Sequence, residues 1–195
     1  MSDTATPTKA ADLALIAVFA ALIAAFSLTP AIPIGIGVPI TLQTLAVVLA
    51  GLVLGPLRGF LATVLYLAVG FAGLPVFAGG AAGIAVLAKP SVGYLLAFPL
   101  GAAVAGWIAQ RFAARRGTIA YLGFFLAGLA ASLVIHAFGI LGLMLVARMS
   151  LADAFLLDLA FWPGDLAKMF VASAIAVAVN KAFPALLAPP RAVTA

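Results

Sequence analysis

Long stretches without a charged residue constrain this chain more than any other feature of its sequence. Charged residues are absent between Asp12 and Arg58, between Arg58 and Lys89, between Lys89 and Arg111, and between Arg116 and Arg148. Each stretch is at least the roughly 20 residues that a helix needs to cross the hydrocarbon core of a bilayer. Only 8% of the residues are charged, whereas a soluble domain carries about a quarter. The sequence therefore predicts an integral membrane protein.

The spanning elements are expected to be α-helices, because lipid cannot hydrogen-bond exposed backbone groups and a helix satisfies them internally. A transmembrane β-barrel would alternate polar and apolar residues, and that alternation does not occur in this sequence. The chain has no Cys, which excludes disulfides and thiolate metal sites. We interpret the net charge of +5 as a sign of membrane orientation rather than of nucleic-acid binding. No cofactor or metal is expected.

Glycine and proline clusters divide the apolar sequence into six expected membrane-spanning helices, so the predicted fold class is all-α and polytopic. The helices are expected at about residues 12–28, 39 or 40–54, 60–71, 91–110, 118–146, and from 162 to about 181–184. Residues 1–11 and 185–195 are expected to be cytoplasmic tails, and residues 12–184 a single transmembrane domain. The first apolar segment lacks a clear small-residue cleavage site and is interpreted as a retained helix.

A long glycine-rich loop is expected between the third and fourth helices, at residues 73–83. Irregular backbone at membrane depth should pack on protein or line a cavity, because lipid leaves its polar groups unpaired. The segment 148–161, with Asp153 and Asp158 among Leu and Phe, is expected to lie at the membrane interface.

Basic residues are distributed unevenly between the two sides of the expected bundle. The side shared by both termini, the second–third turn and the fourth–fifth loop holds seven: Lys9, Arg58, Arg111, Arg115, Arg116, Lys181 and Arg191. The other side holds three: Lys89, Arg148 and Lys168. Because Lys and Arg collect on the cytoplasmic side of a membrane, both termini are predicted to be cytoplasmic. The expected location is the plasma membrane of a prokaryote.

Asp165 and Lys168 are the strongest candidates for a binding site. They lie three residues apart near the start of the last expected helix, so their side chains share one face. Charged residues within a membrane are costly and usually indicate function, and the helix dipole favours an anion in the first turn. A structural salt bridge at the interface is the alternative. Lys89 lies on the same side, and two cations against one anion would suit a ligand with a carboxylate.

Other candidate ligand contacts lie toward the same outer side. Gln43 is one of few polar residues early in the second expected helix, and it could hydrogen-bond a ligand amide or cross-link helices. Gly79 and Gly80 allow the backbone to approach a ligand closely. Together with Phe77 and Tyr94, they could form an apolar lid over a ring system, or the glycines could belong to a flexible outer loop.

Helix 12–28 has alanines at four-residue spacing, at Ala17, Ala21 and Ala25, and again at Ala20 and Ala24. Small residues at this spacing let another helix approach closely. The row of Ala17, Ala21 and Ala25 is therefore a candidate surface for a partner helix, although alanine is abundant throughout the chain.

Two further functions compete with binding. Ser132 and His136 lie one turn apart and could act as nucleophile and base of an intramembrane hydrolase, but no third orienting group is evident. A proton-coupled secondary transporter using Asp165 is another alternative, although six helices are few for two inverted repeats. The chain contains no P-loop sequence, so active uptake would need a partner or a coupling ion.

In five segments the sequence resembles the BioY family, the biotin-specific substrate-binding subunits of energy-coupling factor transporters. The segments are PITLQTL (39–45), GLVLGPLRG (51–59), GLPVFAGG (73–80), PSVGYL (90–95) and WPGDLAK (162–168). At residues 89–93 the chain has KPSVG where the family pattern leads us to expect GPTGG. The role of Lys89 is therefore predicted from this sequence alone.

The resemblance implies a six-helix subunit with an outward-facing biotin pocket roofed by the loop between the third and fourth helices. It implies that Asp165 and Lys168 contribute to this pocket, and that the first helix docks onto a membrane coupling subunit carrying two ATPase subunits. Biotin presents a carboxylate, an apolar ring system and a ureido group. Lys168 or Lys89 could bind the carboxylate and Asp165 or Gln43 the ureido edge, and Asp165 could instead neutralise Lys168.

Overall fold

The structure, a computed structural model, describes residues 9–33 and 38–187, which are mostly helical. The helices are α1 (Lys9–Ser27), α2 (Gln43–Leu54), α3 (Pro56–Phe71), α4 (Val92–Phe112), α5 (Gly117–Val146), α6 (Leu151–Asp158) and α7 (Trp162–Ala182). Three short 3-10 helices are η1 (Ala78–Gly80), η2 (Ile84–Ala88) and η3 (Pro184–Leu186). The strands β1 (Ile32–Pro33) and β2 (Pro39–Ile40) pair antiparallel.

Four of the described helices, α1, α4, α5 and α7, are long and apolar enough to cross a membrane. The longest, α5, has 30 residues, or about 45 Å at 1.5 Å per residue, which exceeds the roughly 30 Å hydrocarbon core. Helices α2 and α3 are also apolar but have only 12 and 16 residues. Apart from one short strand pair, the described chain is therefore a helical membrane protein with four candidate spans and two shorter apolar helices.

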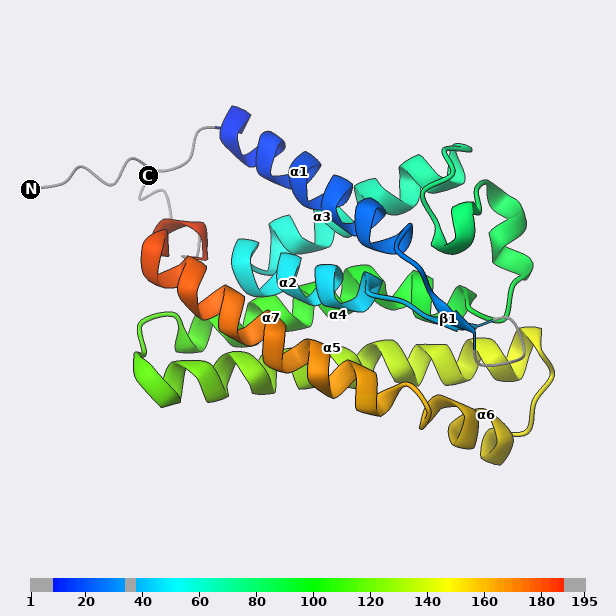
Figure 1. Cartoon of the computed structure of the whole chain (residues 1–195). Helices are drawn as coiled ribbons and strands as arrows, with labels where there is room; N and C mark the ends of the chain where they lie inside the picture. The colour runs from blue at the N-terminus through cyan, green and yellow to red at the C-terminus, as the bar shows by residue number, and fades with distance from the viewer. Residues whose placement is uncertain (1–8, 34–37, 188–195) are drawn as a thin grey trace, which may run out of the picture.

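The helices run alternately up and down the bundle, so their ends gather at two poles (Figure 1). The starts of α2, α4 and α7 lie at the pole with β1, α6 and the segment between α3 and α4. We call this the β1–α6 pole. The starts of α1, α3 and α5 lie at the opposite pole, together with η3.

Small residues allow α4 and α5 to pack closely. A Cβ added to Gly93 on α4 would lie 2.1 Å from the Phe138 carbonyl oxygen on α5, so only glycine fits there. A Cβ on Gly139 of α5 would lie 2.1 Å from the ring of Tyr94. The same close approach therefore packs the Tyr94 ring against α5 at the β1–α6 pole.

Two helix starts differ from the sequence-based expectation. Helix α2 begins at Gln43 rather than at residue 39 or 40, because Pro39 and Ile40 pair with β1 as a short strand. Helix α3 begins at Pro56 rather than at residue 60, because proline is well suited to the first turn of a helix. The turn between α2 and α3 is reduced to Gly55, whose φ of 83° favours glycine.

The segment between α3 and α4 was expected as a glycine-rich loop and contains the two 3-10 helices η1 and η2. It is fastened to the bundle at several points. The Val76 carbonyl accepts hydrogen bonds from Ser27 of α1 and from Tyr66 of α3. The Gly83 amide donates to the Gly70 carbonyl at 2.8 Å. These bonds hold the segment over the β1–α6 pole.

Residues after α7 pack back onto the opposite pole. Arg58 pairs with Asp12 at 3.1 Å and donates to the Leu186 carbonyl at 3.0 Å. Gln110 donates to the Leu187 carbonyl at 3.0 Å, and the Leu187 side chain is buried. The packed unit extends past residue 184, and α1 starts at Lys9 rather than at residue 12.

Candidate functional site

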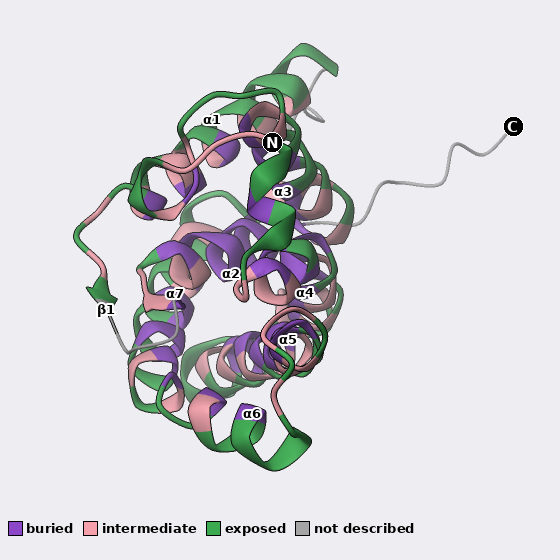
Figure 2. Ribbon diagram, turned by 90° about the vertical axis from the view of Figure 1, so that its right-hand side faces the viewer, coloured by how far each residue is buried: buried purple, intermediate pink, exposed green. Residues whose placement is uncertain are grey.

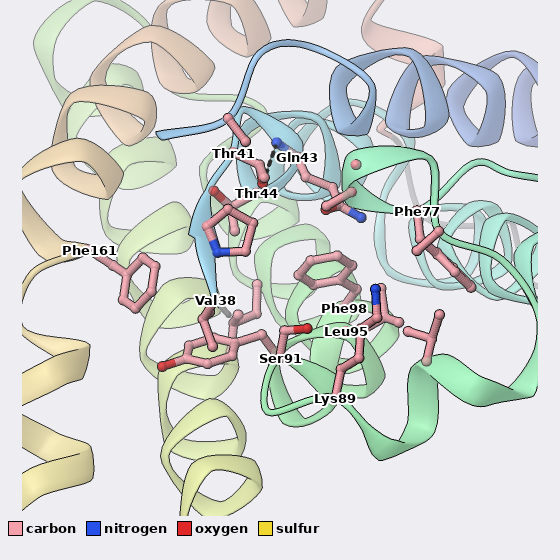
Figure 3. Close-up of a pocket in the computed structure, with 18 of the residues that line it drawn as sticks. Val38, Thr41, Gln43, Thr44, Phe77, Lys89, Ser91, Leu95, Phe98 and Phe161 are labelled. Atoms are coloured by element: carbon pink, nitrogen blue, oxygen red, sulfur yellow. Dashed lines mark hydrogen bonds between the residues drawn. The ribbon is translucent and has the colours of Figure 1, made fainter. Parts of the chain in front are cut away.

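A pocket of about 380 Å³ opens at the β1–α6 pole, within the range of roughly 300–1,000 Å³ typical of small-molecule sites. Figure 2 looks onto this pole and shows buried faces of α2, α4, α5 and α7 turned toward one another. Apolar side chains line much of the pocket: Phe77, Val86, Leu95, Phe98, Ile135 and Phe161. Figure 3 shows Thr41, Gln43 and Thr44 on one side of the pocket, with Lys89 and Ser91 on the other.

Asp165 is the centre of the polar part of the pocket. Its Oδ1 accepts hydrogen bonds from Lys168 Nζ at 2.7 Å and from Thr44 Oγ1 at 3.0 Å. Its Oδ2 lies 2.9 Å from Nε2 of His136. Lys168 also donates to Thr44 Oγ1 at 3.1 Å. Asp165 is only 4% exposed, and a carboxylate taken out of water needs such partners.

Asp158, at the end of α6, is a second buried carboxylate, with 1% of its surface exposed. Its Oδ1 lies 2.7 Å from Nδ1 of His136 and accepts from the Tyr94 hydroxyl at 2.8 Å. Its Oδ2 accepts from the Trp162 indole at 3.1 Å. Three donors on three helices therefore fix this carboxylate.

His136 lies between the two carboxylates, with each ring nitrogen facing one of them. A carboxylate can only accept hydrogen bonds, whereas a neutral imidazole has one donor and one acceptor nitrogen. Both contacts are satisfied when His136 carries a proton on each nitrogen. Two carboxylates, one imidazolium and the Lys168 ammonium then sum to zero charge, which reduces the cost of burying them.

Counting donors and acceptors shows what this cluster leaves for a ligand. Each carboxylate oxygen can accept about two hydrogen bonds and an ammonium group has three donors. Among the described residues, Oδ1 of Asp165 is filled by Lys168 and Thr44, whereas Oδ2 has only the His136 contact. Lys168 uses two of its donors. Within the described residues, one acceptor site on Asp165 and one donor of Lys168 therefore remain without a partner, and both residues line the pocket.

Gln43 and Phe77 are each held in place by α3. The Gln43 amide donates to the Tyr66 hydroxyl at 2.5 Å. The Phe77 ring packs edge-on against Tyr66 and Phe71, with centroids 5.5 and 5.2 Å apart. It also occupies the space beside Gly70, where an added Cβ would lie 2.2 Å from the ring. These contacts give the pocket a rigid aromatic wall.

Lys89 lines the pocket from the segment before α4 and is exposed. Its side chain has no hydrogen-bond or ion-pair partner within residues 9–33 and 38–187. An ammonium group that no carboxylate neutralises gives this part of the pocket a positive charge.

Most residues predicted from the sequence meet at this pocket. Seven of the eight line it: Gln43, Phe77, Gly79, Lys89, Tyr94, Asp165 and Lys168. Gly80 does not line it: this glycine, with a φ of 73°, shapes the turn beside the wall.

The structure bears on two interpretations of polar residues. The segment 148–161 was expected at the membrane interface; within it, Asp158 is buried in the cluster because α6 turns this residue inward. Ser132 and His136 were considered as nucleophile and base. Both ring nitrogens of His136 face carboxylates, so neither is free to take a proton from Ser132.

Thr44 was missed, although it touches both Asp165 and Lys168. A threonine in an apolar helix commonly bonds its own backbone, so the residue alone gave no signal. Its position one residue after Gln43 was the available hint. Among the described residues, no group of three metal-ligating side chains suited to a metal ion is found.

The two alanine rows of α1 point in different directions. Ala17, Ala21 and Ala25 are exposed along the outer face of the helix. Ala20 is buried and Ala24 is partly buried, so this second row packs against the bundle. The outward row is thus unobstructed by the described part of the chain.

Comparison with known proteins gives a consistent result. The family model described as the BioY family matches residues 1–185. The biotin transporter BioY of Rhizobium etli is 42% identical over 179 residues, covering 90% of this chain and 96% of that protein. The biotin transporter BioY of Rhodobacter capsulatus is 41% identical over 185 residues, with the same coverage of 90% and 96%.

A solved structure is also similar. The crystal structure of the S-component for biotin from an ECF-type ABC transporter superimposes with a TM-score of 0.83 at 28% identity. The match covers 93% of this chain and 95% of that one. The overall arrangement of helices is therefore that of a solved S-component for biotin.

Proposed function

The chain belongs to the BioY family, and we propose on that premise that it is the biotin-binding membrane subunit of a vitamin uptake transporter. It captures biotin at the β1–α6 pole, and partner subunits use ATP to drive import. The chain performs no covalent chemistry on the vitamin and is a transporter subunit rather than an enzyme.

The observation that supports biotin most directly is the spare acceptor on Asp165 beside the spare donor on Lys168. A ureido edge presents an N–H donor beside a C=O acceptor, which is the complementary pattern. A charge-balanced cluster favours a neutral polar group such as urea over an anion, because an anion would unbalance buried charge. We therefore assign the ureido group to Asp165 and Lys168.

The remaining surfaces of the pocket suit the other parts of biotin. Apolar walls at Phe77, Leu95 and Phe98 suit the fused rings and the thioether. Lys89, whose ammonium group is exposed, suits the carboxylate at the end of the valerate chain. Gln43 is oriented by Tyr66 and supplies a further polar contact beside the rings.

Two biotin analogues test this assignment. Iminobiotin replaces the ureido oxygen with a nitrogen, whereas desthiobiotin lacks the sulfur but keeps the ureido group. We expect iminobiotin to lose more affinity than desthiobiotin in titrations of the purified protein, and Lys168→Ala to remove most of that difference. An equal loss for both analogues, or unchanged biotin affinity in Lys168→Ala, would contradict the assignment of the ureido group to Lys168.

We propose that six helices cross the membrane, with α2 and α3 as the shorter crossings. The pole opposite the pocket holds most of the basic residues described above, and Lys and Arg favour the cytoplasmic side. This orientation directs the pocket outward and the termini into the cytoplasm of a prokaryote. An accessibility assay on single cysteines introduced at Lys89 and at Arg115 would label Lys89→Cys from outside and Arg115→Cys only from inside.

The partners we propose are a membrane coupling subunit and two ATPase subunits of an energy-coupling factor module. The outward alanine row of α1, at Ala17, Ala21 and Ala25, provides a surface on which a helix of the coupling subunit could pack closely. A proton-coupled mechanism through Asp165 is less favoured, because three donors already engage this carboxylate.

A further inference from the structure

We propose that Asp158 and His136 are positioning residues for biotin binding: Asp158 holds His136 as an imidazolium, and this imidazolium fixes Asp165 with one lone pair directed at the ligand. The inference rests on the proposed function, because it concerns the same pocket. It assigns a role to two residues that do not themselves hydrogen-bond the ligand.

The contacts of His136 occupy both of its ring nitrogens. Although its ring lies at the pocket, its two nitrogens are 2.7 Å from Asp158 Oδ1 and 2.9 Å from Asp165 Oδ2. Neither nitrogen is therefore available to the ligand. The ring also stacks on Trp162, with centroids 4.7 Å apart and planes inclined by 19°. An aromatic face favours a cation above it.

Asp158 lies further from the ligand than His136 does. It does not line the pocket, and it accepts hydrogen bonds from Tyr94 and Trp162 in addition to its contact with His136. Together with His136, these donors fix the orientation of the Asp158 carboxylate. Its negative charge balances the positive charge of His136, just as Lys168 balances Asp165.

The groups that face His136 come from three helices. They are the hydroxyl of Tyr94 on α4, the carboxylate of Asp158 on α6, and the carboxylate of Asp165 with its Lys168 partner on α7. If His136 loses its charge, the cluster of Asp158, Asp165 and Lys168 becomes net negative. A neutral His136 has one N–H donor for two carboxylates, so either Asp165 or Asp158 would lose the hydrogen bond from this ring.

Charge balance gives a test that distinguishes a positioning role of these residues from a role in packing alone. His136→Gln leaves one excess negative charge, and Asp158→Asn leaves the His136 imidazolium without the anion that holds it, whereas the double variant is neutral and contains neither group. We expect each single variant to weaken biotin binding by about tenfold or more, the size expected for disturbing a hydrogen bond to a charged group. The double variant should recover to within about threefold of the wild type, a strong non-additivity.

Ser173→Ala is the matched control, because Ser173 is buried on α7 and bonds only its own helix, at the Met169 carbonyl. It should leave biotin affinity unchanged. A double variant that binds no better than the weaker single variant would overturn the proposal, as would single variants that bind like the wild type.

A second measurement needs no variant, since His136 is the only histidine in the chain. Nitrogen-15 labelling of histidine gives signals from this ring alone. We expect both ring nitrogens to carry protons under the conditions in which biotin binds. One unprotonated ring nitrogen would overturn the proposal even if every variant failed to fold.

Failure of the proposed function has a different signature. A wild-type protein that does not bind biotin but still shows a doubly protonated His136 would contradict the biotin assignment alone. A wild-type protein that binds biotin while the two single variants bind equally well would contradict only the positioning roles of His136 and Asp158.

Discussion

Neutralising Asp165 is the most informative single change in the pocket. Asp165→Asn keeps the size of the side chain but removes its charge. Two cations, His136 and Lys168, would then face only Asp158, so the cluster gains one net positive charge. The ureido N–H of biotin would donate to a neutral amide oxygen in place of a carboxylate.

The expected loss follows from the contacts. A hydrogen bond to a charged group contributes about 1.5–3 kcal/mol, and every 1.4 kcal/mol changes a dissociation constant about tenfold. Losing one such bond to the ligand therefore weakens biotin binding by about ten- to hundredfold. Isothermal titration of the purified protein in detergent measures this directly.

Thr63→Ala is the control for this experiment, because the Thr63 hydroxyl is buried and bonds only its own helix, at the Gly59 and Phe60 carbonyls. It should leave biotin affinity unchanged. If Asp165→Asn remained folded and bound biotin within about twofold of the wild type, the assignment of Asp165 to the ureido group would be refuted.

Three further changes probe other parts of the molecule. Gly70→Ala places a Cβ where the Phe77 ring now lies, 2.2 Å away, and should weaken biotin binding about tenfold without loss of helical circular dichroism; unchanged affinity would mean that this wall does not contact the ligand. Lys89→Gln should weaken binding of biotin about tenfold but barely affect biotin methyl ester, and equal losses would contradict the carboxylate assignment. Ala21→Leu should leave biotin binding by the purified subunit intact yet reduce uptake in cells that hold the coupling subunits, unlike the exposed control Val171→Leu on α7; equal uptake by the two variants would contradict docking at the alanine row.

The sequence predicted much of the helical arrangement, because long apolar stretches bounded by glycine, proline and charge leave few alternatives. The resemblance to the BioY family was confirmed. The start of α2 was placed too early since Pro39 suits the first turn of a helix, but pairing with β1 places it in a strand. Such a pairing depends on tertiary contacts that local propensity does not report.

The candidate site was predicted only in part, because some of its contacts join residues that are far apart in the sequence. Asp165 and Lys168 stood out because they are charges three residues apart in an apolar helix. The contact of His136 with Asp158 spans 22 residues and its contact with Asp165 spans 29, and each joins two different helices. No periodicity within one helix reveals such contacts. Asp158 also lies with Asp153 among Leu and Phe in the segment 148–161, which favoured the interpretation of this segment as interfacial.

The most direct test of the central claim is isothermal titration of the purified, detergent-solubilised subunit with biotin, with thiamine and riboflavin as controls. The account predicts tight one-to-one binding of biotin and no heat from either control. A folded protein that binds no biotin, or that binds the three vitamins alike, would contradict the claim that this pocket is built for biotin.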